Sequence, residues 1–317
     1  MKLEDIYSLA IELGIQNDPR ESAAIERLLE EAKKAYDKLD ADEKDLFDKE
    51  GLRNPYADTR ILAGDPGLEI TGILAGVDLE APEVLLADRL KSAGVLVNML
   101  LTHHPEGKAL AGLPDVMAMQ ADVWHKQGVP INIGDALIGG RMKEVYRTLL
   151  PLNHNRSVDA AKLLNFAFMS CHTPADNLVT NFVQSHLDER DPLKFKEVVD
   201  ALLEIPEYRA AAKDKTGPMI LVGDGERRAG KIVVDMTGGT EGPEESIAKL
   251  AEAGVGTVVQ MHLGDKLRKK AEKSKLNVVI AGHIASDSIG LNLFLDKLEA
   301  RGISIYPCSG LYRISRQ

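Results

Sequence analysis

Residues 70–105, ITGILAGVDLEAPEVLLADRLKSAGVLVNMLLTHHP, decide the fold class of this chain. The run ITGILAGVD has the apolar texture of a buried strand, PEVLLADRLKSAG that of an amphipathic helix, and VLVNMLLTHHP that of a second buried strand. A strand, a helix and a strand at this spacing form a βαβ unit, which implies a parallel sheet covered by helices on both faces. The stretch therefore predicts an α/β protein.

A second series of the same kind closes the chain. Apolar runs at 230–236 (GKIVVDM), 255–265 (VGTVVQMHLGD), 276–283 (LNVVIAGH) and 302–308 (GISIYPC) alternate with helical stretches. Both series contain Ala-Gly-Val, at Ala93 and at Ala253, before a strand that ends in histidine. This repetition indicates two related halves. The alternative is that any two βαβ units share a turn and an apolar strand.

The segments between the two series complete the expected architecture. NFAFMSCHTPAD (165–176) predicts a strand that runs into polar residues, VPINI (129–133) a short strand, and residues 177–213 helices. MILVGDGERRAGKIVVDM (219–236) predicts a hairpin around the turn Gly223-Asp224-Gly225, because glycine and small polar residues favour tight turns. Residues 1–60 are predicted to be a helical extension with solvated charges.

The length of 317 residues favours two domains over one core. We expect a helical extension at 1–60, a first α/β domain at 61–215 with a helical insertion at about 135–164, and a second α/β domain at 216–317. The predicted fold is thus two related βαβ-containing domains with the site in the cleft between them, plus the N-terminal helical extension.

Composition narrows the function classes. A net charge of −10 and 4% aromatic residues argue against nucleic acid as a partner, since that binding depends on Lys and Arg contacts and on aromatic stacking. Two cysteines, Cys171 and Cys308, are too few for a disulfide framework. The N-terminus lacks the basic start of a secretion signal, and no run of about 18 apolar residues predicts a membrane helix. We expect a cytoplasmic protein without a membrane partner.

Three strand ends carry histidine: Thr102-His103-His104-Pro105, His172-Thr173-Pro174-Ala175-Asp176 and His283-Ile284-Ala285-Ser286-Asp287. Imidazole nitrogen with carboxylate oxygen is the ligand mixture that binds Zn, Mn, Fe, Co or Ni. Five or six such ligands exceed the needs of one catalytic zinc and suit two ions that share a water or hydroxide. The three strand ends together therefore predict a metal site.

Each motif also has an ordinary explanation. Asp176 fits the acid of a capping box, and Asp287 fits the acidic first turn of a helix capped by Ser286. Cys171 reads as a core thiol, because strand neighbours point to opposite faces. The loop 236–242 (MTGGTEG) lies between a strand and a helix as phosphate loops do, but it lacks a Walker or dinucleotide pattern, so it also reads as a tight turn.

The ordered set THHP, HTPAD, the GG loop after IVVDM, and GHIASD resembles the motifs of the NGG-interacting-factor-three-like family of dinuclear metal proteins, also labelled GTP cyclohydrolase type I-like. The resemblance covers roughly residues 68–317. It implies two α/β domains with a metal pair in the cleft and a ring-shaped homohexamer. It places the metal ligands at these residues: His103, His104, Asp176, His283 and Asp287. It also places His172 beside the metals, in a catalytic role, and matches an acid before the first helix to Asp78.

This chain departs from the family pattern in three ways. Asp287 stands where the family usually has glutamate, so its bridging role is open. The segment between THHP and HTPAD is longer than usual, and the first 60 residues are extra.

These motifs support three hypotheses. The first is a metal-dependent hydrolase with two divalent ions, zinc among the candidates, in which His172 and His262 transfer protons and the substrate is nucleotide-like or a small polar molecule. The second is a metal-binding scaffold or regulatory interaction protein without turnover. The third is a sensor that binds a phosphate ligand through the Gly238 loop and does not need metal.

Overall fold

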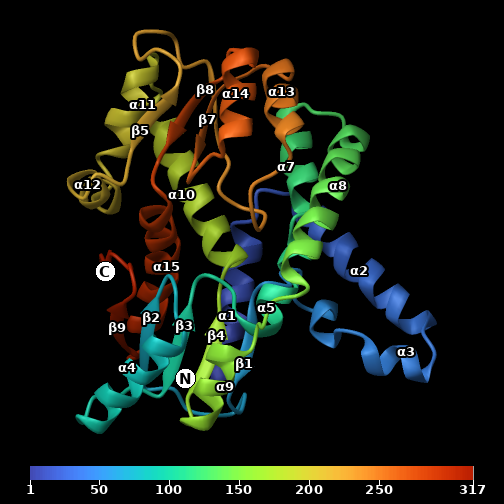
Figure 1. Ribbon diagram of the computed structural model, residues 1–317, viewed down its shortest axis with the longest axis vertical. Coiled ribbons are helices and arrows are strands. Elements are labelled where there is room, and N and C mark those ends of the chain that lie inside the picture. The colour runs from blue at the N-terminus through green and yellow to red at the C-terminus, as the bar shows by residue number, and fades with distance from the viewer. Residues whose placement is uncertain (317) are drawn as a thin grey trace.

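Two β-sheets, each covered by helices, organise the chain in the computed structural model, which describes residues 1–316 (Figure 1). The first sheet has the order β1-β4-β3-β2-β9, and the second has the order β5-β8-β7-β6. Strands of the first sheet are β1 (Arg60–Ala63), β2 (Gly72–Gly76), β3 (Met99–Thr102), β4 (Ala167–Ser170) and β9 (Ser304–Cys308). Strands of the second sheet are β5 (Met219–Val222), β6 (Lys231–Val234), β7 (Val255–Gln260) and β8 (Asn277–Ile280).

The two sheets share one topology. In each, the first strand along the chain lies antiparallel at an edge, β1 against β4 and β5 against β8, and the next three strands are parallel. Only β9 has no counterpart. The prediction of an α/β fold with two related βαβ-containing units and N-terminal helices is confirmed.

The helices connect and cover these strands. They are α1 (Leu3–Gln16), α2 (Ser22–Lys38), α3 (Ala41–Leu46), the 3₁₀ helix η1 (Lys49–Leu52), α4 (Ala81–Ser92), α5 (Gly107–Ala111), α6 (Leu113–Val116), α7 (Met119–Gln127), α8 (Ile131–Leu149), α9 (Arg156–Leu163), α10 (Thr173–Arg190), α11 (Phe195–Leu202), α12 (Pro206–Lys213), α13 (Glu244–Glu252), α14 (Asp265–Ser274) and α15 (His283–Glu299). No helix within residues 1–316 is long and apolar enough to cross a membrane.

Helices α10 and α15 join the two halves in the middle of the molecule (Figure 1). Each follows the central strand next to the antiparallel edge of its sheet, β4 or β8, within a few residues. They approach so closely that a Cβ on Gly290 of α15 would lie 2.3 Å from the carbonyl oxygen of Ala175 in α10. Both helix N-termini are therefore held at the cleft between the sheets.

Two expected strand features are wrong. The segment VPINI is not a strand, because Pro130 precedes α8 and the buried Gly134 and Ile138 follow at helical spacing. The turn at Gly223 exists, with φ of 116°, but no hairpin forms. β5 pairs with β8 and β6 pairs with β7, so two parallel strands separate the partners expected of each other.

The chain also crosses the expected domain boundaries. β9 leaves the second series and pairs with β2 in the first sheet. Within residues 1–60, α1 packs into the core of the first sheet through buried Leu3, Ile6 and Tyr7, whereas α2 and α3 project from the body (Figure 1). α8, in the expected insertion, packs against the second half through Ile138 and Val145. The division at 60/61 and 215/216 stays a prediction.

Candidate metal centre

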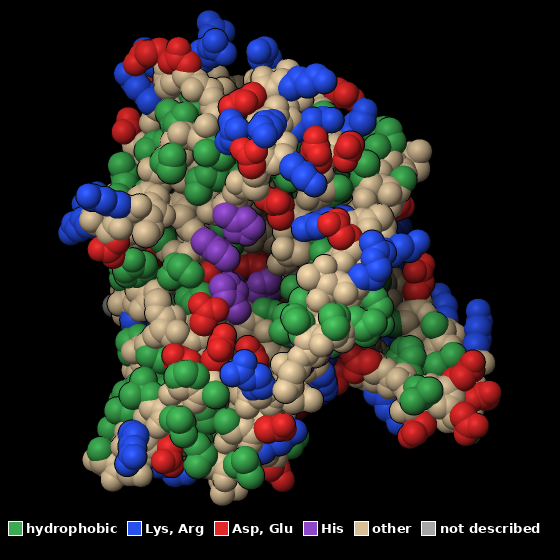
Figure 2. All heavy atoms as spheres, viewed as in Figure 1, with side chains coloured by type: hydrophobic (Ala, Val, Ile, Leu, Met, Phe, Trp, Pro, Cys, Tyr) green, Lys and Arg blue, Asp and Glu red, His purple; other side chains and the backbone are tan. Residues whose placement is uncertain are grey.

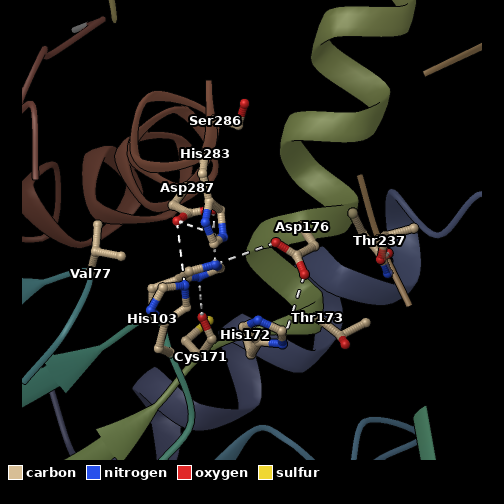
Figure 3. A network of polar contacts seen from close by, with 12 residues as sticks. Val77, His103, Cys171, His172, Thr173, Asp176, Thr237, His283, Ser286 and Asp287 are labelled. Carbon is tan, nitrogen blue, oxygen red and sulfur yellow. Dashed lines mark hydrogen bonds and ion pairs between the residues drawn. The ribbon is translucent and has the colours of Figure 1, made fainter. Parts of the chain in front are cut away.

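The three histidine-bearing strand ends meet in one hollow. Figure 2 shows histidine side chains gathered at the waist of the molecule, with acidic side chains beside them, and Figure 3 shows the inner residues from close by. His103 and His104 follow β3, whereas His172 and Asp176 lie at the start of α10. His283 and Asp287 lie in the first turns of α15. The space at these residues is lined from both halves.

His103 is 1% exposed and faces two carboxylates. Its Nδ1 lies 3.2 Å from the carbonyl oxygen of Cys171, which can only accept, so Nδ1 carries the proton of a neutral ring. Its Nε2 lies 3.4 Å from an oxygen of Asp176 and 3.4 Å from an oxygen of Asp287. A lone pair that faces two carboxylates needs a cation between them, either a proton or a metal ion.

Two further histidines are oriented by carboxylates. His104 Nδ1 lies 2.6 Å from Asp78 Oδ1, and its Nε2 lies 3.5 Å from Asp287 Oδ2. His172 Nδ1 lies 2.8 Å from Asp58 Oδ2. Metal-binding histidines usually donate the other ring N–H to a carboxylate or a carbonyl in this way. His103, His104 and His172 thus all leave Nε2 available for a ligand.

Three carboxylate oxygens at the centre lack a hydrogen-bond partner among the described residues. Asp287 is fully buried, and neither of its oxygens has a hydrogen-bond partner among the described residues. Oδ1 of Asp176, which is 4% exposed, has none either. Buried carboxylate oxygens without partners are costly, and a bound cation would satisfy them. The capping-box interpretation of Asp176 finds no support, because the backbone N–H of the N-cap residue, His172, donates to Thr59 Oγ1 instead.

Charges across the site shift its pKa values in opposite directions. Burial opposes protonation of the His103 ring, but Asp287 and Asp176 outweigh it and raise its pKa well above 6.5. Burial would raise the pKa of Asp287, but the neighbouring histidines lower it below 3.8. The pKa of His283, by contrast, is lowered because burial dominates. The inner site therefore favours charged carboxylates around a positive centre.

Two groups of residues could each hold an ion. His103, His172 and Asp176 form one, and His103, His104 and Asp287 form the other, each with ligand atoms within 4.8 Å of one another. His283 lies at the edge, with Nε2 3.6 Å from Asp287 Oδ2 and a side chain 40% exposed. The structure thus brings the six predicted site residues together. The ligand roles of five of them and the catalytic role of His172 stay predictions.

Other residues shape the cleft, and the sequence did not point to all of them. Asp58 was missed, because it lies in the segment expected to be a helical extension, just before a short strand. Gln120 of α7 was also missed; its Nε2 donates to the carbonyl oxygens of Gly238 and Thr240 and holds the loop 236–242 over the cleft. His262 was predicted; its ring lies 4.9 Å from that of His283.

Three other polar side chains near the predicted motifs have structural roles. Ser286 does not cap α15 through its side chain; its hydroxyl donates to the Gly282 carbonyl oxygen and contacts the buried Tyr208 hydroxyl at 2.9 Å. Cys171 is a buried thiol, as expected, and its pKa is raised by burial. His186, on α10 outside the cleft, bonds a backbone carbonyl oxygen.

The fold and the site together define a two-sheet α/β protein with a buried histidine–aspartate centre between its halves. Among solved structures, a NIF3 superfamily protein from Sphaerobacter thermophilus is similar to this chain, with 27% identity, a TM-score of 0.72, and coverage of 82% of this chain and 94% of that chain. This similarity supports the resemblance to the NIF3-like family that the ordered motifs indicated.

A second structure supports the fold alone. Reduced HcgD from Methanocaldococcus jannaschii is 16% identical, with a TM-score of 0.53, over 84% of this chain and 94% of that chain. No family model matches the sequence, and no curated protein matches it. The buried histidine and aspartate groups could hold a metal ion, so metal binding is consistent with both the family and the geometry.

Proposed function

We propose that this protein binds two divalent metal ions in the cleft and hydrolyses a small substrate there. One observation carries the proposal: Oδ1 of Asp176 and both carboxylate oxygens of Asp287 have no hydrogen-bond partner among the described residues, and both side chains face imidazole nitrogens. A cation bound at each group would pair with the carboxylate oxygens that lack a partner. It would also separate the imidazole lone pairs from the carboxylates that they face.

The donor set assigns residues to two positions. His172 and Asp176 would hold one ion, and His104, His283 and Asp287 would hold the other. His103 belongs to both candidate groups and would lie between the two ions. The fit is chemical, because nitrogen and carboxylate oxygen suit Zn, Mn, Fe, Co or Ni. His172 becomes a ligand in this assignment, since its ring is buried and its Nδ1 is bonded to Asp58. The alternative is the predicted one, in which His172 has a catalytic role and is not a ligand.

Two divalent ions held by these residues would lower the pKa of bound water and so would make hydroxide available at neutral pH. The chain's own groups would move protons and shape access. His262 is half exposed in the cleft, with Nδ1 4.0 Å from Glu241 Oε1, so it can hold a proton close to the site. The phosphate-sensor hypothesis loses support, because neither lysine nor arginine lines the described cleft.

The competing hypothesis is a metal-binding scaffold without turnover. Zinc as the metal, a homohexamer, and a cytoplasmic location stay predictions from the sequence and the family resemblance. The scaffold hypothesis shares the metal site, so only turnover separates the two.

Elemental analysis of purified protein tests the metal site. We expect about two ions per chain in the wild type and a clear loss in Asp287→Asn and His103→Ala, because each removes a group that faces the centre. His186→Gln, on α10 outside the cleft, is the matched control and should keep the metal. Full metal content in both site variants would refute the ligand assignment.

Activity is then tested on protein stripped with chelator and reloaded. Phosphoesters, esters and cyclic amides should be screened with and without metal. Hydrolysis that returns with metal and is absent in Asp287→Asn supports the hydrolase. Stoichiometric metal without turnover of any substrate would instead favour the scaffold.

A further inference from the structure

The space directly at the candidate ligands is small. Its volume is about 80 Å³, room for only a few waters or for one small polar group. Small-molecule sites usually occupy about 300–1,000 Å³. Any substrate must therefore extend from the centre into a neighbouring space.

One neighbouring groove shares a candidate ligand with the centre. It has a volume of about 520 Å³, and His283 lines both spaces. In Figure 2, side chains coloured as hydrophobic lie next to the histidines on one side of the hollow. A molecule bound at the centre can thus reach the groove past the imidazole of His283.

The groove is apolar and uncharged. Ile284, Leu311 and Tyr312 supply apolar side chains to its lining, Thr216 also lines it, and no Lys, Arg, Asp or Glu lines it within the described residues. An apolar or aromatic group would bury area there, whereas a phosphate or carboxylate would find no cationic partner.

The wall is also fixed before any ligand binds. Tyr312 N donates to Ser288 Oγ at 3.0 Å, and its hydroxyl donates to Asp214 at 2.8 Å. The backbone of Ser309 accepts from Val77 N at 3.1 Å, next to the acid that orients His104. A groove held by such contacts binds with little loss of conformational entropy.

A second neighbouring space is less suited to an apolar group. It has about 530 Å³ and touches the centre only through Glu241 and Gly242. Arg141, Lys266 and several acidic side chains line it. Charged walls of both signs favour a polar or ionic occupant over a hydrocarbon.

We propose that the groove formed by Thr216, Ile284, Leu311 and Tyr312 binds an apolar or aromatic substituent of the substrate while its polar reacting group sits at the metal centre. This inference rests on the proposed function. It narrows the substrate class to uncharged esters or amides with such a substituent and disfavours nucleotides.

Binding of two hydroxamates to the metal-loaded protein tests the inference without requiring turnover. Acetohydroxamate and benzohydroxamate carry the same chelating group, and only the second carries a ring for the groove. Calorimetric titration should give at least about tenfold tighter binding of benzohydroxamate, as expected for filling an apolar pocket. Elemental analysis of each sample establishes that metal is present.

Two groove variants test whether the preference for benzohydroxamate arises in the groove. Ile284→Asn makes the lining polar, and Thr216→Phe adds a ring that fills part of the groove, so either should reduce the affinity ratio toward one. Ile131→Asn makes the first change on an exposed residue of α8 and should keep the wild-type ratio. Because the two variants alter different walls, a folding failure of one leaves the other as the test.

The outcomes separate two failures. Equal affinity of the two probes in metal-loaded wild type, or a preference kept in Ile284→Asn and Thr216→Phe, would overturn the groove while leaving the metal centre intact. Absence of metal in wild-type samples would overturn the proposed function and this inference with it. A ratio of about ten that collapses in the groove variants alone supports the inference.

Discussion

Replacing Gly290 by alanine should push apart the two helices that hold the site. A Cβ at this position would lie 2.3 Å from the carbonyl oxygen of Ala175 and 2.8 Å from its carbonyl carbon. Ordinary contacts between such atoms need more than about 3.3 Å, so α10 and α15 must separate by about 1 Å. Overpacking of this kind costs about 1–3 kcal/mol, and the better helix propensity of alanine offsets up to about 1 kcal/mol. We expect a net loss of about 1–2 kcal/mol.

The same displacement should weaken metal binding. Asp176 directly follows Ala175 on α10, and Asp287 precedes Gly290 by one helical turn on α15. Metal–ligand distances tolerate only about 0.2 Å, so a shift near 1 Å is expected to lower affinity at least tenfold. The stability loss is measured by urea denaturation of metal-free protein, and the affinity by competition with a chelator.

Gly140→Ala is the matched control for this prediction. Gly140 also lies inside a helix, α8, but a Cβ there would meet nothing within 4 Å. Without a clash, alanine should stabilise by about 0.5–1 kcal/mol. If Gly290→Ala proved as stable as Gly140→Ala, with unchanged metal affinity, the close approach of α10 and α15 would not set the geometry of the site.

Three further changes test separate parts of the structure. Asp58→Asn removes the charge that orients the histidine at the start of α10, so metal affinity in a chelator competition should fall about 10–100-fold; unchanged affinity would exclude an orienting role. Burial raises the pKa of the Asp235 carboxyl group from 3.8 to about 6. The folded protein therefore binds the carboxyl proton more tightly than the unfolded chain does, and this contribution to the free energy of unfolding is lost as the pH rises from about 4 through 6. Asp235→Asn should therefore stabilise at pH 7.5 by at most about 3 kcal/mol, an upper bound because the side chain is partly exposed, and urea curves should converge near pH 4. Arg316→Ala strips the fully buried Glu207 of two contacts of 2.7 Å and should cost about 3 kcal/mol in urea denaturation, while the exposed Arg301→Ala should cost little; equal losses would contradict the buried pair.

The parallel strands and the inner site were predictable because the signals are local. β2, β3 and β4 are buried along their whole length, so each appears as an apolar run that stops at polar residues. Carboxyl ends of parallel strands meet at one edge of a sheet. His103, His172 and their neighbours could therefore be placed together before the fold was known.

The edge strands, and the carboxylates that orient the histidines, were not predictable, because their positions depend on residues far away in the sequence. β1 is four residues long, RILA, and follows a polar stretch, so nothing local marks it as a strand. Its antiparallel pairing with β4 carries Asp58 to His172, more than a hundred residues away. β9 likewise gains its place only through β2, and the turn at Gly223 cannot show that β5 prefers β8 over β6.

The internal repeat allows equivalent positions on the two sides of the cleft to be compared, and these positions carry different residues. Strands β3 and β7 occupy equivalent places in their sheets, and the two residues that follow them are His103-His104 in one half and Met261-His262 in the other. The end of β3 thus supplies two imidazoles to the centre, whereas at most one is available from the equivalent strand end in the second half.

The helices α10 and α15 each contribute a His-x-x-x-Asp pair, but the pair begins at the N-cap of α10 and at the first residue of α15. One residue is about 100° of helical rotation, so the two pairs do not face the centre in the same way. The pair on α10 is buried, whereas His283 on α15 stays 40% exposed beside the apolar groove. If the proposed function holds, substrate would therefore enter on the α15 side, where the His283 side chain can be reached from solvent and from the groove.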